Sequence, residues 1–139
     1  MDINELVLPK AALDAIDNGA WVPAGDSAPD VRFKVIGFMS EEAQKYTKNK
    51  QAALRTANKG KPLDSDQELE VIKQALADVC LKDWEGITQN GEAVPYSKEL
   101  AKEWIMSRAG DKFTSLVLLA VKKLDNNANA YVEEVSKNS

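Results

Sequence analysis

Histidine is absent from the 139-residue sequence, and cysteine occurs only once, at Cys80. The lack of imidazole excludes a serine or cysteine nucleophile that works with a histidine base, and it removes the commonest zinc ligand. A single cysteine cannot close an intramolecular disulfide, which fits a reducing compartment. We expect Cys80 to pack in the core rather than to react.

Long apolar runs and a basic leader are missing as well. The longest purely apolar run is Leu116–Val121, far shorter than the roughly 20 residues that a membrane-spanning helix needs. The chain starts with Met-Asp-Ile-Asn-Glu, which is acidic where a secretion signal is basic and then apolar. These two features predict a cytosolic protein that has no membrane partner.

Glycine-rich phosphate loops and calcium loops are not found either. The seven glycines are isolated from one another and form no phosphate-binding motif. Acidic residues alternate between positions 64 and 70, but Leu69 and Ala75 stand where an EF-hand loop needs glycine and glutamate. We therefore predict a protein that is not an enzyme, with no catalytic residue, no metal site and no cofactor.

The charges that are present are unevenly distributed along the chain. The net charge is −4, yet residues 32–62 are mainly basic, while the segments on either side are mainly acidic. An acidic protein with a single basic stretch argues against nucleic acid as the main partner. The pattern suits a chain that pairs with copies of itself, although a helix with a solvated basic face is the simpler explanation and the one we favour.

Two short strands are predicted near the N-terminus. Residues 31–35 alternate apolar and polar side chains, which is typical of a strand with one buried face, and residues 20–22 are a plausible antiparallel partner. The first thirty residues are otherwise rich in proline and glycine, which leaves room only for short elements.

Helices are predicted for most of the remaining chain. Ser40 is expected to cap a helix over residues 41–57, and Ser65 with Glu68 to form a capping box for a second helix that ends at Gly86. Asn90-Gly91 predicts a tight turn, and Ser97 caps a third helix that extends to about Arg108. A fourth begins near residue 112. The predicted fold is mainly α: a small helical domain of about four helices with a minor N-terminal β element and a tight turn near Asn90-Gly91.

We expect one domain over residues 1–139, with a loop-rich segment over 1–30, a core over 31–125 and a C-terminal helix end over 126–139. In the last helix, apolar residues follow a heptad spacing from position 117 to position 135. This stripe predicts that the helix packs in the core up to Leu124. Beyond Leu124, we expect the helix either to contact a partner or to fray. The candidate client or partner contacts are Trp84, Tyr96, Val117, Val121, Leu124, Tyr131 and Val135.

A segment in the middle of the chain resembles a known family. Trp84-Glu85-Gly86-Ile87 follows an apolar helix and is followed by Gly91 and then by Val94-Pro95-Tyr96-Ser97. This order is similar to the "W-E-G-[IV]…dG…vPfs" segment of the tail assembly chaperones of long-tailed (siphovirus-type) bacteriophages. Tyr96 stands where phenylalanine is more familiar. The motif is structural rather than catalytic: its aromatic rings flank a chain reversal, which suits either a recognition surface or a stabilised corner.

The resemblance implies a chaperone that binds the tape-measure protein and keeps it soluble until tail tube protein assembles around it. It implies action in the cytoplasm of the infected bacterial host, absence from the mature virion, and a homo-oligomer. It also implies a longer form of the protein made by ribosomal frameshifting, for which Ser136, Lys137 and Asn138 are the candidate position. Two alternatives stay open at this point: a structural tail or connector protein of the virion, and a small nucleic-acid-binding adaptor.

Overall fold

Three antiparallel strands and the long helix that packs on one face of them form the centre of the computed structural model, which describes residues 1–132. The helices of this part are α1 (Ile3–Leu6), α2 (Lys10–Asn18), α3 (Glu41–Ala57), α4 (Ser65–Ala75), α5 (Lys98–Met106) and α6 (Asp111–Asn126). The strands are β1 (Ala20–Pro23), β2 (Arg32–Val35), β3 (Leu81–Glu85), β4 (Thr88–Gln89) and β5 (Glu92–Ala93). A π-helical turn, η1 (Leu76–Cys80), follows α4, and a 3₁₀ turn, η2 (Arg108–Gly110), precedes α6.

The prediction of a mainly α domain of about four helices is wrong, because the described chain combines six α-helices with a three-stranded and a two-stranded sheet. The expected helix from Ser65 to Gly86 ends eleven residues early, at Ala75. The π turn then closes with a hydrogen bond from the Leu81 amide to the Leu76 carbonyl, and the chain enters β3 directly. Leu81 and Trp84 are buried as members of that strand, so the burial expected from a helix comes from a sheet.

The sheet has the order β1-β2-β3, with both pairs antiparallel. The predicted pairing of residues 20–22 with the strand at 31–35 is confirmed, with Val22 opposite Phe33. On the other side of β2, Phe33 lies opposite Trp84. Because residues directly opposite each other share a face, these three side chains line one buried surface of the sheet.

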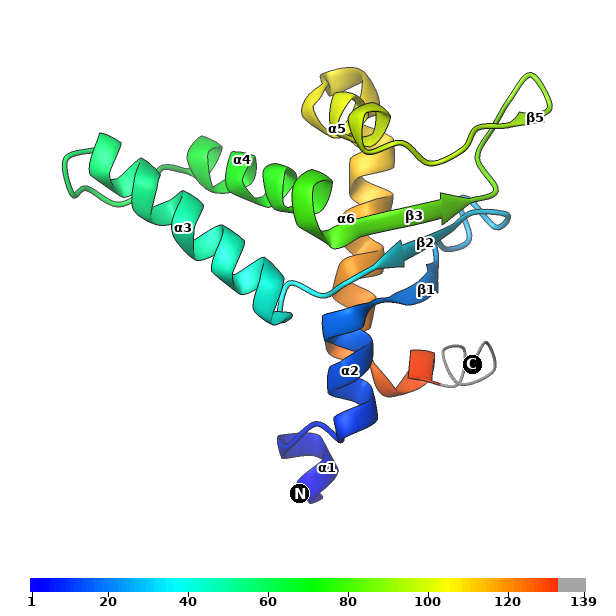
Figure 1. Ribbon diagram of the computed structural model, residues 1–139, viewed down its shortest axis with the longest axis horizontal. Coiled ribbons are helices and arrows are strands. Elements are labelled where there is room, and N and C mark those ends of the chain that lie inside the picture. Colours follow the sequence, from blue (N-terminus) through cyan, green and yellow to red (C-terminus); the bar gives the residue numbers. More distant parts are fainter. Residues whose placement is uncertain (133–139) are drawn as a thin grey trace.

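Helix α6 covers that buried surface. Figure 1 shows α6 crossing the strands behind the sheet, with α2 below and α5 above. Val117, Val121 and Leu124 of α6 are fully buried, in one core with residues from the sheet and α2. Since Ala12 and Ile16 are fully buried in the same core, the segment before residue 30 contributes to it directly.

Helices α3 and α4 form an antiparallel hairpin that projects away from the sheet (Figure 1). The prediction for α3 is confirmed at both ends, and the Ser40 hydroxyl accepts a hydrogen bond from the Ala43 amide as its N-cap. The capping box of α4 is shifted by one residue from the prediction: it joins Asp64 with Gln67 instead of Ser65 with Glu68. Gln67 also exchanges two amide hydrogen bonds with Asn58, at 2.8 and 3.0 Å, which tie the loop of the hairpin.

The end of α6 is fastened to the segment between β2 and α3. The Asp125 carboxylate accepts hydrogen bonds from the amides of Phe38 and Met39, at 2.9 and 3.1 Å. A Cβ atom at Gly37 would lie 2.1 Å from the Asp125 carboxylate, so only glycine allows this approach. Burial raises the pKa of Asp125, although both amide hydrogen bonds favour its charged form.

Within the described part of the chain, no helix is long and apolar enough to cross a membrane.

The contact between α6 and the sheet predicts a large cost for Leu124→Ala. The substitution removes a fully buried side chain, so the free energy of unfolding should fall by about 2–5 kcal/mol. Leu119→Ala is the matched control on the same helix, because Leu119 is 45% exposed, and it should cost less than about 1 kcal/mol. Urea unfolding followed by circular dichroism measures both values. Equal losses for the two variants would contradict this packing.

Candidate functional site

The chemistry available in the described residues is limited. Residues 1–132 contain no group of three or more potential metal ligands. Burial raises the pKa of the Cys80 thiol to about 12, which keeps this side chain an uncharged, apolar-packing thiol at neutral pH. Trp84 and Tyr96, the candidate residues nearest the middle of the chain, lie at an aromatic corner.

The corner between β3 and α5 is organised by Trp84. Its indole nitrogen donates a hydrogen bond of 2.7 Å to the Val94 carbonyl, across the chain reversal. The Tyr96 ring meets the indole edge to face at 5.1 Å, and its hydroxyl donates to the Leu81 carbonyl at 3.2 Å. Trp84 and Tyr96, both singled out from the sequence, are thus brought together and locked to the backbone.

The reversal itself uses left-handed backbone conformations. Asn90 and Gly91 have φ values of 53° and 82° between β4 and β5, as a two-residue Asn-Gly hairpin requires. Gly86 has a φ of 87°, and a Cβ atom there would lie 1.8 Å from the Asp30 carbonyl oxygen. Gly86 therefore ends a strand against the loop before β2, and not a helix as predicted.

An aromatic cluster extends from this corner to the surface. The Trp104 ring of α5 stacks on Trp84 at 5.2 Å, and Phe113 of α6 meets the Trp104, Trp84 and Phe33 rings edge to face at 5.0, 5.7 and 5.7 Å. Stacked and edge-to-face contacts of this kind stabilise a cluster beyond the burial of its area. These aromatic contacts make the corner a rigid support for the protein surface above it.

A shallow apolar groove of about 280 Å³ lies on the exposed side of this cluster. We call it the corner groove; it is lined by Val31, Phe33, Ile87, Trp104, Lys112, Phe113 and Leu116. Trp104, Phe113 and Leu116 are only half-buried, so their apolar surfaces face solvent. Lys112 is the single charged member of the lining.

A second apolar groove, of about 420 Å³, lies between the α3–α4 hairpin and α6. We call it the hairpin groove; it is lined by Phe38, Thr47, Gln51, Glu68, Val71, Ile72, Leu118 and Lys122. Because an α-helix turns about 100° per residue, Leu116 and Leu118 lie on opposite flanks of the exposed side of α6, with Leu119 between them. The two grooves therefore lie on either side of the exposed face of α6, on which Leu119 is flanked by Lys112, Ser115 and Lys122.

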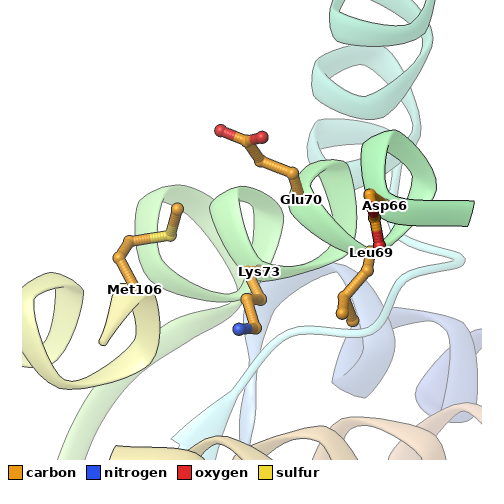
Figure 2. Close-up of a pocket in the computed structure, with 5 residues that line it drawn as sticks. All are labelled: Asp66, Leu69, Glu70, Lys73 and Met106. Atoms are coloured by element: carbon orange, nitrogen blue, oxygen red, sulfur yellow. The ribbon is translucent and has the colours of Figure 1, made fainter. Parts of the chain in front are cut away.

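A third depression, between α4 and α5, is polar. Figure 2 shows its lining residues, Asp66, Leu69, Glu70, Lys73 and Met106, around a volume of about 320 Å³. The charged ends of Glu70 and Lys73 point in different directions and do not converge on a common point (Figure 2). We assign no binding role to this depression.

The remaining predicted contact residues divide into three groups. Val117, Val121 and Leu124 are fully buried beneath the sheet, so they are not available at the surface in this structure. Tyr131 is half-buried and packs against the core. Val135 and the candidate frameshift position at Ser136, Lys137 and Asn138 lie outside the described residues.

Sequence reasoning missed the members of the corner groove. No sequence motif singles out Trp104 or Phe113 as a contact residue, and Ile87 appears only as part of the motif that begins at Trp84. Only the spacing of Phe113 and Leu116, one turn apart on a single helix, hinted at a shared face. The convergence of four segments on one groove, those of residues 31–33, 87, 104 and 112–116, depends on tertiary contacts.

A family model described as "YdaY prophage protein" matches residues 38–138. The matched range begins after β2 and includes α3, α4, β3, the corner and α6. No curated protein and no solved structure matches the chain.

The geometry of the corner predicts that Trp84→Ala destabilises the protein strongly. The substitution empties the middle of the aromatic cluster and removes the bond to the Val94 carbonyl, so we expect a loss of about 3–5 kcal/mol in urea unfolding. Trp21→Ala is the control, because this half-buried ring lies under Arg32 on the other face of the sheet, and its loss should be clearly smaller. An unchanged unfolding midpoint for Trp84→Ala would show that the corner does not hold the fold together.

Proposed function

The chain belongs to the YdaY prophage protein family and is therefore phage-derived, and on this premise we propose that it is a phage tail assembly chaperone. It binds the tape-measure protein and keeps it soluble while the tail tube is assembled. It acts without catalysis, in the cytoplasm of the infected host, and leaves before the virion is mature.

The observation that carries this proposal is the corner groove. The sequence motif that resembles the chaperones, from Trp84 to Ser97, supplies Ile87 to the lining of this groove and supports the Trp104 ring from beneath through the Trp84–Trp104 stack. Half-exposed aromatic and leucine side chains on a rigid base are typical of surfaces that anchor a partner. A structural corner alone would not require Trp104 and Leu116 to face solvent.

The groove suits the apolar stripe of an amphipathic helix. Such helices bind by laying residues spaced three and four apart into an apolar groove, which fits a tape-measure protein that is helical and exposed before assembly. Covering that stripe removes the surface through which unassembled copies aggregate. The groove is shallow, so the bound helix stays partly accessible, and tail tube protein can displace the chaperone.

The other partners belong to the same proposal. A homo-oligomer and a longer frameshifted form follow from the resemblance to the chaperones, and the uneven charge distribution along the chain suits self-association.

Co-expression with the tape-measure protein tests the proposal. The wild-type chain should keep this client soluble and co-purify with it, whereas Leu116→Asp, which places a charge in the corner groove, should weaken binding at least about 10-fold. Ile87→Asp provides a second charge in the groove from a different element. Leu69→Asp is the control, because this leucine is 50% exposed and lies outside both apolar grooves.

Thermal melts should first show that each variant is folded. A client that is no more soluble with the wild-type chain than without it would contradict the chaperone function. Equal binding by folded Leu116→Asp and Leu69→Asp would exclude the corner groove. Recovery of the protein from purified virions would favour a structural tail protein instead.

A further inference from the structure

One side of α3 carries a row of exposed cations. Because an α-helix turns about 100° per residue, positions 45, 48, 52 and 55 fall within one sector about 80° wide. This sector lies opposite the fully buried Ala43, so it faces solvent along the whole helix. We call it the basic stripe; its cations are Lys45, Lys48 and Arg55. The loop at the tip of the hairpin adds two further exposed cations, Lys59 and Lys61.

No carboxylate neutralises the basic stripe within residues 1–132. None of the ion pairs in that part of the chain includes one of its cations, and Glu68 of α4 lines the hairpin groove without pairing to α3. After its first two residues, α3 itself contains no acidic residue. A helix face that is only solvated gains stability when acids and bases alternate at spacings of three and four, whereas like charges at these spacings repel each other. The basic stripe forgoes this gain, which favours an external anionic partner.

The position of α3 gives a large partner access to the stripe. The α3–α4 hairpin projects away from the sheet (Figure 1), and α3 packs against α4 and η1 with its other side. The protein has a net charge of −4, so a polyanion is repelled by much of its surface. A projecting basic helix lets such a partner bind while it stays away from the acidic remainder of the chain.

The composition of the stripe favours double-stranded nucleic acid over two other anionic partners. A protein partner is anchored by apolar or aromatic side chains at the centre of the contact, and Ala52 is the only apolar residue of the stripe. A single strand needs exposed aromatic rings on which its bases stack. The one aromatic residue of α3, Tyr46, is half-buried, donates its hydroxyl hydrogen to Asp78 and lies under Lys50. Duplex phosphates need neither feature, because lysine and arginine bind them through charge alone.

We propose that the basic stripe binds the phosphate backbone of double-stranded DNA without reading its sequence. Positions 45 to 59 span about 21 Å along the helix axis, and a duplex carries one phosphate charge per roughly 1.7 Å of its own axis, so several phosphates lie within reach. Binding of this kind is weak, with a Kd of about 10⁻⁶–10⁻⁴ M at physiological salt. It goes beyond the proposed chaperone function and does not depend on it, because no residue of the stripe lines the corner groove.

Fluorescence anisotropy of a labelled DNA duplex of mixed sequence, titrated with the full chain over a salt series, tests this binding. With three to five phosphates contacted, the affinity should fall roughly 100-fold between about 50 and 200 mM salt. Lys48→Gln and Arg55→Gln should each reduce the slope of log Kd against log salt by about 1, and the double variant by about 2. Lys10→Gln is the matched control: it removes the same charge from a side chain on α2 that is 88% exposed, and it should keep the wild-type slope.

The substituted residues are all exposed, so thermal melts should show unchanged midpoints for every variant. A wild-type chain that does not bind the duplex at about 50 mM salt would overturn the proposal, as would equal slopes for Lys48→Gln and Lys10→Gln. Two competitors test the choice of partner. Poly-L-glutamate that competes as strongly as unlabelled duplex at equal charge would assign the stripe to acidic proteins instead, and single-stranded DNA that binds as tightly as the duplex would also contradict the proposal.

Discussion

The packing of α6 against the buried face of the sheet is the contact on which the rest of the structure depends. One side of this helix fills the space over Phe33 and Val22, and its end holds the segment before α3 through Asp125. The opposite side is left exposed between two grooves. A single helix thus completes the core and also contributes Leu116 and Leu118 to the two apolar grooves.

Local signals in the sequence predict the elements that local chemistry determines. Ser40 and the breakers after Ala57 set the ends of α3, and Asn90-Gly91 sets the hairpin turn. Strand β3 could not be found in this way, because the apolar spacing before Trp84 also fits a helix. Its identity comes from pairing with β2, about fifty residues earlier in the chain, and a pairing over that separation leaves no local signal.

In the candidate site, too, some features are predicted by local sequence and others depend on tertiary contacts. The motif around Trp84 and Tyr96 is readable as a chain reversal with flanking rings, and the structure has these rings in contact. The heptad spacing of apolar residues in the last helix is equally clear. This spacing does not reveal, however, whether the apolar face packs against the chain's own sheet or against a second protein. Here the sheet covers Val117 and Val121, and α6 contributes apolar surface to the two grooves through Leu116 and Leu118 at its flanks.

The central proposal is that the corner groove holds the client. Hydrogen–deuterium exchange of the chain, alone and in complex with the tape-measure protein, tests it most directly. We expect added protection at the turn around Ile87, in the second half of α5 around Trp104 and in the first half of α6, with little change at the tip of the α3–α4 hairpin. Protection confined to that tip, or no protection at all in a stable complex, would contradict it.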